Sequence, residues 1–95
     1  MKVLIEKRER VFNTLLELFK SIESYDCLTK REQELILIAA ITTNRSREGL
    51  FIHAQNALDA GATQDEIIQA ITCCLPIAGI AAINEALDAV MALFN

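Results

Sequence analysis

Apolar residues recur at helical spacing along almost the whole chain, and the alternation typical of strands is absent. The first such stripe lies within residues 3–24 and consists of Phe12, Leu15, Leu16, Phe19 and Ile22. Lys and Glu occupy the other faces of this segment, as expected for an amphipathic helix. The pattern therefore predicts one leading helix that ends near the SYDC sequence.

Two capping boxes predict where later helices begin. In TKRE, Thr29 and Glu32 have the spacing at which a side chain and a backbone amide satisfy each other reciprocally. Thr63 and Glu66 repeat this spacing in TQDE. We expect helices to follow both boxes, the first of them over residues 30–43.

The segment between the boxes predicts a buried helix followed by a second one. The run LILIAAI, residues 35–41, is apolar on all sides, so we expect its helix to be buried on every side. Ser46 is a suitable N-cap for the next helix, over about residues 47–60, and Gly61 is a suitable residue to end it.

The last third of the chain predicts two more helices separated by a break. The helix that follows Thr63 should reach about Leu75, where Pro76 and Gly79 interrupt it. An alanine-rich helix should then occupy residues 80–94, because small residues allow close approach of neighbouring helices. The sequence thus predicts an all-α fold of about five helices.

Length and composition indicate one domain that is built for oligomerisation. Its 95 residues are typical of a single unit, in which residues 1–28 form the leading helix and residues 29–94 the core. The chain is 53% hydrophobic, and its mean hydropathy is +0.31. So small a protein cannot readily bury that much apolar surface alone, so we expect a homo-oligomer.

Charge and apolar run length exclude two classes of partner. The formal net charge is −4, and the few aromatic residues include no Trp, so the chain is not expected to bind nucleic acid. No apolar run approaches the roughly 20 residues that a membrane-spanning helix needs. Charges follow the first three apolar residues, which leaves no signal-peptide core. We therefore expect a soluble, cytoplasmic protein.

The three cysteines favour packing over redox chemistry. Cys73 and Cys74 are adjacent, and neighbouring residues of one helix point about 100° apart, too far for a disulfide without distortion. Cys27 stands alone, and the chain has no CxxC motif. All three are interpreted as small hydrophobic residues in a reducing compartment, with a redox role for the adjacent pair as the weaker alternative.

Glu34 and His53 are the candidate acid/base residues. Glu34 lies in the first turns of the apolar helix, where the alternative is a solvated carboxylate favoured by the helix dipole. His53 is the only histidine and has mostly apolar neighbours, so from periodicity alone a packed, hydrogen-bonded histidine is the leading alternative. One histidine without suitably placed cysteines does not make a zinc site, and we expect no metal.

Arginines near His53 are candidates for binding a substrate carboxylate. Arg45 and Arg47 flank the start of the helix that carries His53, and a guanidinium can hold a carboxylate through two hydrogen bonds. Solvation or a bridge between subunits is the alternative for both residues, and it is the preferred interpretation for Arg31.

Two segments, GLFIHAQNALDAGATQDEI and PIAGIAAINEAL, give the chain a family resemblance. Together with REQELILIAAI, they resemble the carboxymuconolactone decarboxylase family, which also contains the alkylhydroperoxidase AhpD proteins. The resemblance covers about residues 30–94. It implies an all-α fold that forms trimers or hexamers, with active sites near subunit interfaces.

The resemblance also assigns residues. In the AhpD branch, a glutamate stands nineteen positions before the key histidine, which corresponds to Glu34 and His53. A CxxC pair stands seven and four positions before that histidine, where this chain has Ser46 and Gly49. Neither residue can supply the thiolate that attacks a peroxide, so the usual peroxidase mechanism is not expected.

The decarboxylase branch also lacks the cysteine pair, and the resemblance therefore implies cofactor-free decarboxylation or proton transfer on a small carboxylated substrate. In this hypothesis His53 is the general acid/base, Glu34 orients it, and Arg45 or Arg47 binds the carboxylate. Two alternatives stay open: an AhpD-like antioxidant protein, disfavoured by the missing CxxC, and a non-catalytic helical oligomer.

Overall fold

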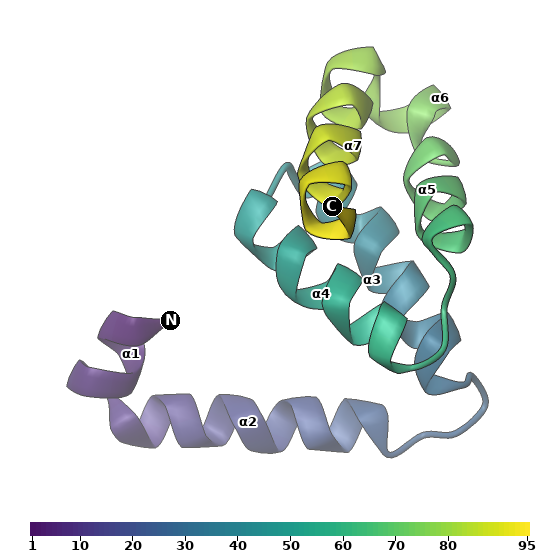
Figure 1. The fold of residues 1–95 in the computed structure, drawn as a ribbon. Coiled ribbons are helices and arrows are strands. Elements are labelled where there is room, and N and C mark those ends of the chain that lie inside the picture. Colours follow the sequence, from purple (N-terminus) through teal and green to yellow (C-terminus); the bar gives the residue numbers. More distant parts are fainter.

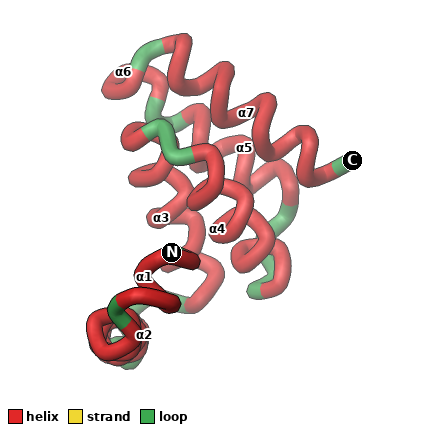
Figure 2. The backbone as a smooth tube through the Cα atoms, turned by 90° about the vertical axis from the view of Figure 1, so that its left-hand side faces the viewer, coloured by secondary structure: helices red, strands yellow, loops and turns green.

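The protein is built of helices only, as the computed structural model of residues 1–95 shows (Figure 1). The helices are α1 (Lys2–Lys7), α2 (Glu9–Glu23), α3 (Lys30–Asn44), α4 (Arg47–Asp59), α5 (Gln64–Thr72), α6 (Leu75–Ala78) and α7 (Ile80–Phe94). The predicted all-α class is confirmed. Helices α3, α4, α5 and α7 pack together, whereas α1 and α2 lie beside this bundle (Figure 2). None of the helices is both long enough and apolar enough to cross a membrane.

The predicted helix starts are confirmed by their hydrogen bonds. At α3 the Thr29 side chain accepts the Glu32 amide, and the Glu32 carboxylate accepts the Thr29 amide. At α5, Thr63 and Glu66 exchange the same pair of bonds. The Ser46 hydroxyl caps α4 by accepting the amide of Gly49 at 3.3 Å. These caps are local in sequence, which is why the pattern of residues predicts them.

The turn between α3 and α4 is tight and reverses the chain. Arg45 adopts a left-handed conformation with φ of 58°, and the Ser46 amide donates to the carbonyl of Ile41. The end of α4 shows the same left-handed pattern, there with Gly61 at φ of 95°. A non-glycine residue in this conformation costs about 1–2 kcal/mol. The turn allows α4 to pack along α3.

The core lies between α3, α4, α5 and α7, and alanines make up much of it. Its buried apolar residues are Ile38, Leu50, Ala54, Ala57, Ala62, Ile67, Ile71, Cys74, Ile83, Ala86, Ala89 and Val90. Small side chains on α4 and α7 let these helices approach closely. An ion pair between Arg31 and Glu66 ties α3 to α5 at the edge of this core.

The expectation that residues 35–41 are buried on every side is wrong for the single chain. Ile38 is fully buried, but Ile36 and Leu37 are 54% and 40% exposed. Helices α4, α5 and α7 cover one side of α3 only. The other side of this apolar run has no covering helix of the core.

The leading segment also differs from the single helix expected over residues 3–24. Arg8, with φ of −144° and ψ of 61°, separates α1 from α2. Neither helix has a buried residue, and Phe19 and Ile22 on the apolar stripe of α2 are 43% and 58% exposed. The stripe therefore exists but is not covered within one chain.

The predicted break at Pro76 and Gly79 is confirmed, although α5 ends at Thr72 and not near Leu75. Pro76 lies in the first turn of the short α6, where a missing amide hydrogen has no consequence for helix bonding. Gly79, with φ of 86°, then redirects the chain into α7.

Candidate functional site

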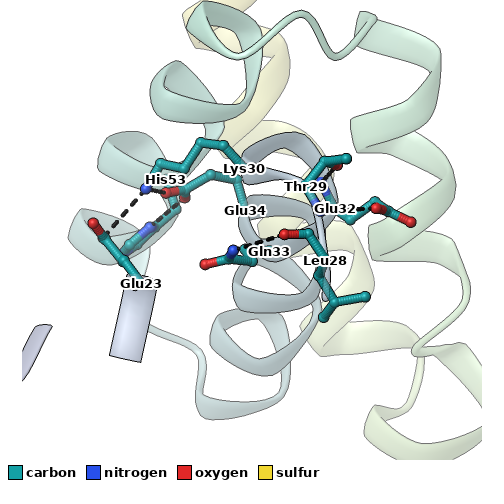
Figure 3. A network of polar contacts seen from close by, with 8 residues as sticks. All are labelled: Glu23, Leu28, Thr29, Lys30, Glu32, Gln33, Glu34 and His53. Carbon is teal, nitrogen blue, oxygen red and sulfur yellow. Dashed lines mark hydrogen bonds and ion pairs between the residues drawn. The ribbon is translucent and has the colours of Figure 1, made fainter. Parts of the chain in front are cut away.

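The structure brings Glu34 and His53 together. Glu34, on the second turn of α3, is 1% exposed, and its Oε2 lies 2.7 Å from Nδ1 of His53 on α4 (Figure 3). The solvated alternative for Glu34 is therefore excluded. The His53 side chain is 29% exposed, so it joins a buried carboxylate to the surface of the protein.

Both oxygens of the Glu34 carboxylate have partners. Oε1 lies 2.8 Å from Nζ of Lys30, one turn earlier on α3, and Oε2 contacts the imidazole of His53. An ionised carboxylate only accepts hydrogen bonds, so Nδ1 of His53 carries the hydrogen between them. The neutral ring is thus held in the tautomer whose Nε2 has a free lone pair.

Lys30 extends this pair to a chain of four charged or titratable groups. Its Nζ lies between Glu34 and Glu23, 3.2 Å from Oε1 of Glu23 at the end of α2 (Figure 3). The pKa of Lys30 is raised, chiefly by its hydrogen bond to Glu34 and to a smaller extent by Glu23, whereas burial lowers it. Lys30 is therefore a firmly charged ammonium beside the buried carboxylate.

Lys30 and Glu23 are site residues that were not predicted from the sequence. A signal for Lys30 was available, because it stands four residues before Glu34 and such pairs face each other on a helix. No local sequence pattern predicts Glu23, because it lies on α2. It comes close to Lys30 only because the linker between α2 and α3 turns.

His53 opens into a groove of about 350 Å³ between the end of α2 and the open side of α3. Its lining residues are Phe19, Ile22, Glu23, Leu28, Lys30, Gln33, Ile36, Leu37 and His53. The Gln33 amide donates to the carbonyl of Leu28 at 3.0 Å and holds the linker against α3. The groove thus combines apolar walls with one polar end, an arrangement typical of small-molecule sites.

Arg45 and Arg47 are not brought to this pair. Arg45 forms an ion pair with Glu85 of α7, with 2.9 Å between Nε and Oε2, and Arg47 lies over the ring of Phe51 at 5.2 Å from its centroid. Hydrogen bonding between Arg45 and Glu85 raises the pKa of the guanidinium and lowers that of the carboxyl. Both arginines line a separate cavity of about 140 Å³ beside α7.

The physical reason is distance along α4. Arg47 precedes His53 by six residues, which is about 9 Å along the axis at a rise of about 1.5 Å per residue. Nearness in sequence therefore did not translate into a shared site. Within the chain, the cation beside Glu34 and His53 is Lys30.

The positions of the CxxC pair hold no thiol, although they do face each other. A Cβ atom placed on Gly49 would lie 3.2 Å from Oγ of Ser46. The existing cysteines are elsewhere: Cys27 and Cys73 are exposed, and Cys74 is buried against the carbonyl of Ala39 at 3.4 Å. Burial raises the pKa of the Cys74 thiol, which opposes formation of a thiolate.

Comparison with known families matches residues 9–92 to the carboxymuconolactone decarboxylase family. The match begins with α2, so on the N-terminal side it extends beyond residues 30–94, on which the resemblance rested, and it ends at residue 92. Comparisons with curated proteins and with solved structures gave no match.

Proposed function

The chain belongs to the carboxymuconolactone decarboxylase family, and on this premise we propose that it performs cofactor-free acid/base chemistry on a small carboxylated substrate. The observation that carries the proposal is the contact between buried Glu34 and partly exposed His53 at the polar end of the groove. His53 acts as the general acid/base, and Glu34 is a positioning residue that fixes the tautomer and orientation of the imidazole.

One form of this chemistry is decarboxylation. The bond between a substrate carbon and its carboxylate breaks, carbon dioxide leaves, and the electron pair moves into an adjacent unsaturated carbonyl group. Protonated His53 then gives its proton from Nε2 to the substrate carbon, and the neutral ring takes up another proton from water. Nδ1 of His53 stays occupied by Glu34 during this step.

The other form is proton transfer without loss of carbon dioxide. Neutral His53 removes a proton from a carbon next to a carbonyl group through Nε2, and it returns the proton at another carbon of the same enolate. Both forms use the same nitrogen and the same partner, because Nδ1 is occupied by Glu34.

Lys30 takes the role that the sequence analysis gave to Arg45 and Arg47. It lines the groove with His53, whereas the two arginines line the other cavity. A lysine ammonium is a point charge with three donors, and it binds a carboxylate without the two-pronged geometry of arginine. We assign the substrate carboxylate to Lys30.

We also propose that the protein works as a homo-oligomer, a trimer or hexamer. Exposed apolar residues on α2, such as Leu18, and on α4, such as Ile52, form surfaces that a second copy would cover. An isolated helix of 15 residues, the length of α2, is marginal in water without packing. A non-catalytic oligomer would use these surfaces equally well, but it would not need the Glu34–His53 pair.

We propose the cytoplasm as the compartment in which the protein works. All three cysteines are free, and two of them are exposed. Exposed thiols persist in a reducing compartment.

The proposal is tested by incubating the full chain in deuterated water with a panel of β-keto acids and monocarboxylated unsaturated lactones. Release of carbon dioxide and incorporation of deuterium next to the carbonyl group are measured against reactions without protein. We expect turnover of at least one compound by the wild type and its loss in His53→Gln. Equal rates for wild type and His53→Gln across the panel would overturn the proposal.

A further inference from the structure

We infer that Glu23 is an internal competitor for the substrate: its carboxylate occupies Lys30 while the site is empty, and the substrate carboxylate displaces it. The inference rests on the proposed function, which assigns the substrate carboxylate to Lys30. It comes from the contact between Nζ of Lys30 and Oε1 of Glu23, 3.2 Å apart at the polar end of the groove (Figure 3).

The ammonium of Lys30 is held in place by Glu34. Its Nζ lies 2.8 Å from Oε1 of Glu34, a residue that is 1% exposed, and the other oxygen of Glu34 contacts His53. Loss of Lys30 would leave this buried carboxylate with one partner fewer, which is costly. Glu34 therefore keeps its contact with Lys30 when a ligand arrives.

Glu23 is held much more weakly than Glu34. Its side chain is 53% exposed, and water screens its pair with Lys30, which is itself 49% exposed. Glu23 is also the last residue of α2, where the negative end of the helix dipole disfavours a carboxylate. Because α2 has no buried residue, the Glu23 side chain can turn into water without disturbing a packed core.

A substrate carboxylate on Lys30 would be the third carboxylate around one ammonium if Glu23 stayed. Carboxylates that share one ammonium lie close enough to repel each other. Of the two carboxylates already present, Glu23 is the one that can leave at low cost. Protonation of His53 would attract the substrate further and so favours the exchange.

The exchange is compatible with the proposed oligomer. Five residues separate Leu18 from Glu23, so at about 100° per residue the two side chains lie about 140° apart around α2. A second copy that contacts Leu18 therefore leaves the Glu23 side of the helix open to water.

Binding of two matched compounds tests the inference without any reaction. The probes are cyclohexanecarboxylate and cyclohexanecarboxamide, which share an apolar ring and differ in charge. Binding to the full chain at pH 7 is followed by NMR through the methyl groups of Ile36 and Leu37, which line the groove. We expect the ratio of carboxylate to carboxamide affinity to rise about two- to five-fold in Glu23→Gln, because the competitor is removed.

Glu23→Asp separates competition from simple charge repulsion. It keeps the charge, but its side chain is one methylene shorter and does not reach an ammonium that Glu34 holds in place. The affinity ratio should therefore rise in Glu23→Asp by nearly the same factor as in Glu23→Gln. Glu17→Gln and Glu17→Asp, in an exposed pair with Lys20, are the matched controls and should leave the ratio unchanged.

The carboxyl carbon of Glu23 reports the exchange directly. At saturation with cyclohexanecarboxylate, its NMR signal in the wild type should move to the position found in Lys30→Met without ligand, because Glu23 has lost Lys30 in both cases. A signal that stays in place at saturation would overturn the inference, since all three carboxylates would then share Lys30.

Two other results would also overturn the inference. One is a Glu23→Asp variant that binds like the wild type, and the other is no binding of cyclohexanecarboxylate by either wild type or Glu23→Gln. If the affinity ratios behave as expected but turnover does not depend on His53, the acid/base proposal falls and the competition stands. If turnover depends on His53 but the ratios do not change, the acid/base proposal stands and the competition falls.

Discussion

The carboxylate of Glu34 and the imidazole of His53 meet at 2.7 Å across two helices, although nineteen residues separate them in sequence. Glu34 is buried, and its only other charged partner is Lys30. Burial of a carboxylate is costly unless it is paired and hydrogen-bonded. The two contacts therefore explain how the carboxylate is tolerated, and the exposure of His53 explains how it can act on a substrate.

Lys30 should stabilise the fold through Glu34. Lys30→Met leaves the buried carboxylate with one partner fewer, and we expect it to lower the free energy of unfolding at pH 7 by about 1 kcal/mol. This value is the low end of the range of about 1–3 kcal/mol for a buried group that loses a partner. We choose the low end because the Lys30 side chain is 49% exposed and water screens the pair. Lys20→Met, which removes a fully solvated pair with Glu17, is the control and should change stability by no more than about 0.5 kcal/mol.

The same variant has a distinctive dependence on pH. The folded-state pKa of Lys30 is raised above its ordinary value of 10.5, so its stabilising effect is complete below that pH. It is lost as the pH rises through the folded-state pKa. Urea unfolding at pH 8 and pH 11 should therefore show the difference between wild type and Lys30→Met shrinking at the higher pH. A difference that stays constant would contradict the ion pair.

Glu34 and His53 should behave as one unit in catalysis. On the most reactive compound of the panel, we expect kcat to fall about 10²–10⁴-fold in His53→Gln, as is usual for a general acid or base. Glu34→Gln should lower kcat about 10–100-fold with little change in KM, because it removes orientation and not binding. The double variant should be no slower than His53→Gln. Multiplicative losses would show that the two residues act independently.

The exposed apolar stripe of α2 should hold the oligomer together. Leu18→Glu places a charge at the edge of this stripe, at a residue that is 53% exposed, and light scattering should show a fall in mass from trimer or hexamer toward monomer. Lys20→Glu, on the solvated face of the same helix, should leave the mass unchanged. An unchanged mass in Leu18→Glu, or a monomeric wild type, would contradict this assignment.

The positions of Ser46 and Gly49 should accept a disulfide. Because a Cβ on Gly49 would lie 3.2 Å from Oγ of Ser46, the double variant Ser46→Cys/Gly49→Cys should oxidise to an intrachain disulfide. Thiol titration of the unfolded chain after mild oxidation should then give the same three free thiols as the wild type. Two additional free thiols would show that these positions do not face each other as described.

The wild type itself should not reduce peroxides with a thiol reductant.

The local features of the fold follow from the sequence, because their causes are local. Thr29, Ser46 and Thr63 each cap a helix by a bond to an amide three residues away. The break at Arg8 and the open side of α3 were not predicted. The open side of α3 depends on which surfaces neighbouring helices cover, and an apolar pattern does not say what covers it. No local pattern marks the break at Arg8.

The candidate site was predictable in part. Periodicity alone favoured a solvated Glu34 and a packed His53, and the pair was singled out by the spacing that the family resemblance supplied. The resemblance did not supply Lys30, although its spacing to Glu34 was visible. Arg45 and Arg47 were chosen for nearness in sequence, but they turn toward α7 and Phe51 at the start of α4, whereas His53 lies in the middle of this helix.

The tautomer of His53 tests the central claim most directly. In a long-range proton–nitrogen NMR spectrum at a pH where the ring is neutral, the wild type should show hydrogen on Nδ1 and none on Nε2. Glu34→Gln should give a mixture of tautomers, while Glu17→Gln should match the wild type. Hydrogen on Nε2 in the wild type, or the same tautomer distribution in wild type and Glu34→Gln, would contradict a catalytic histidine oriented by Glu34.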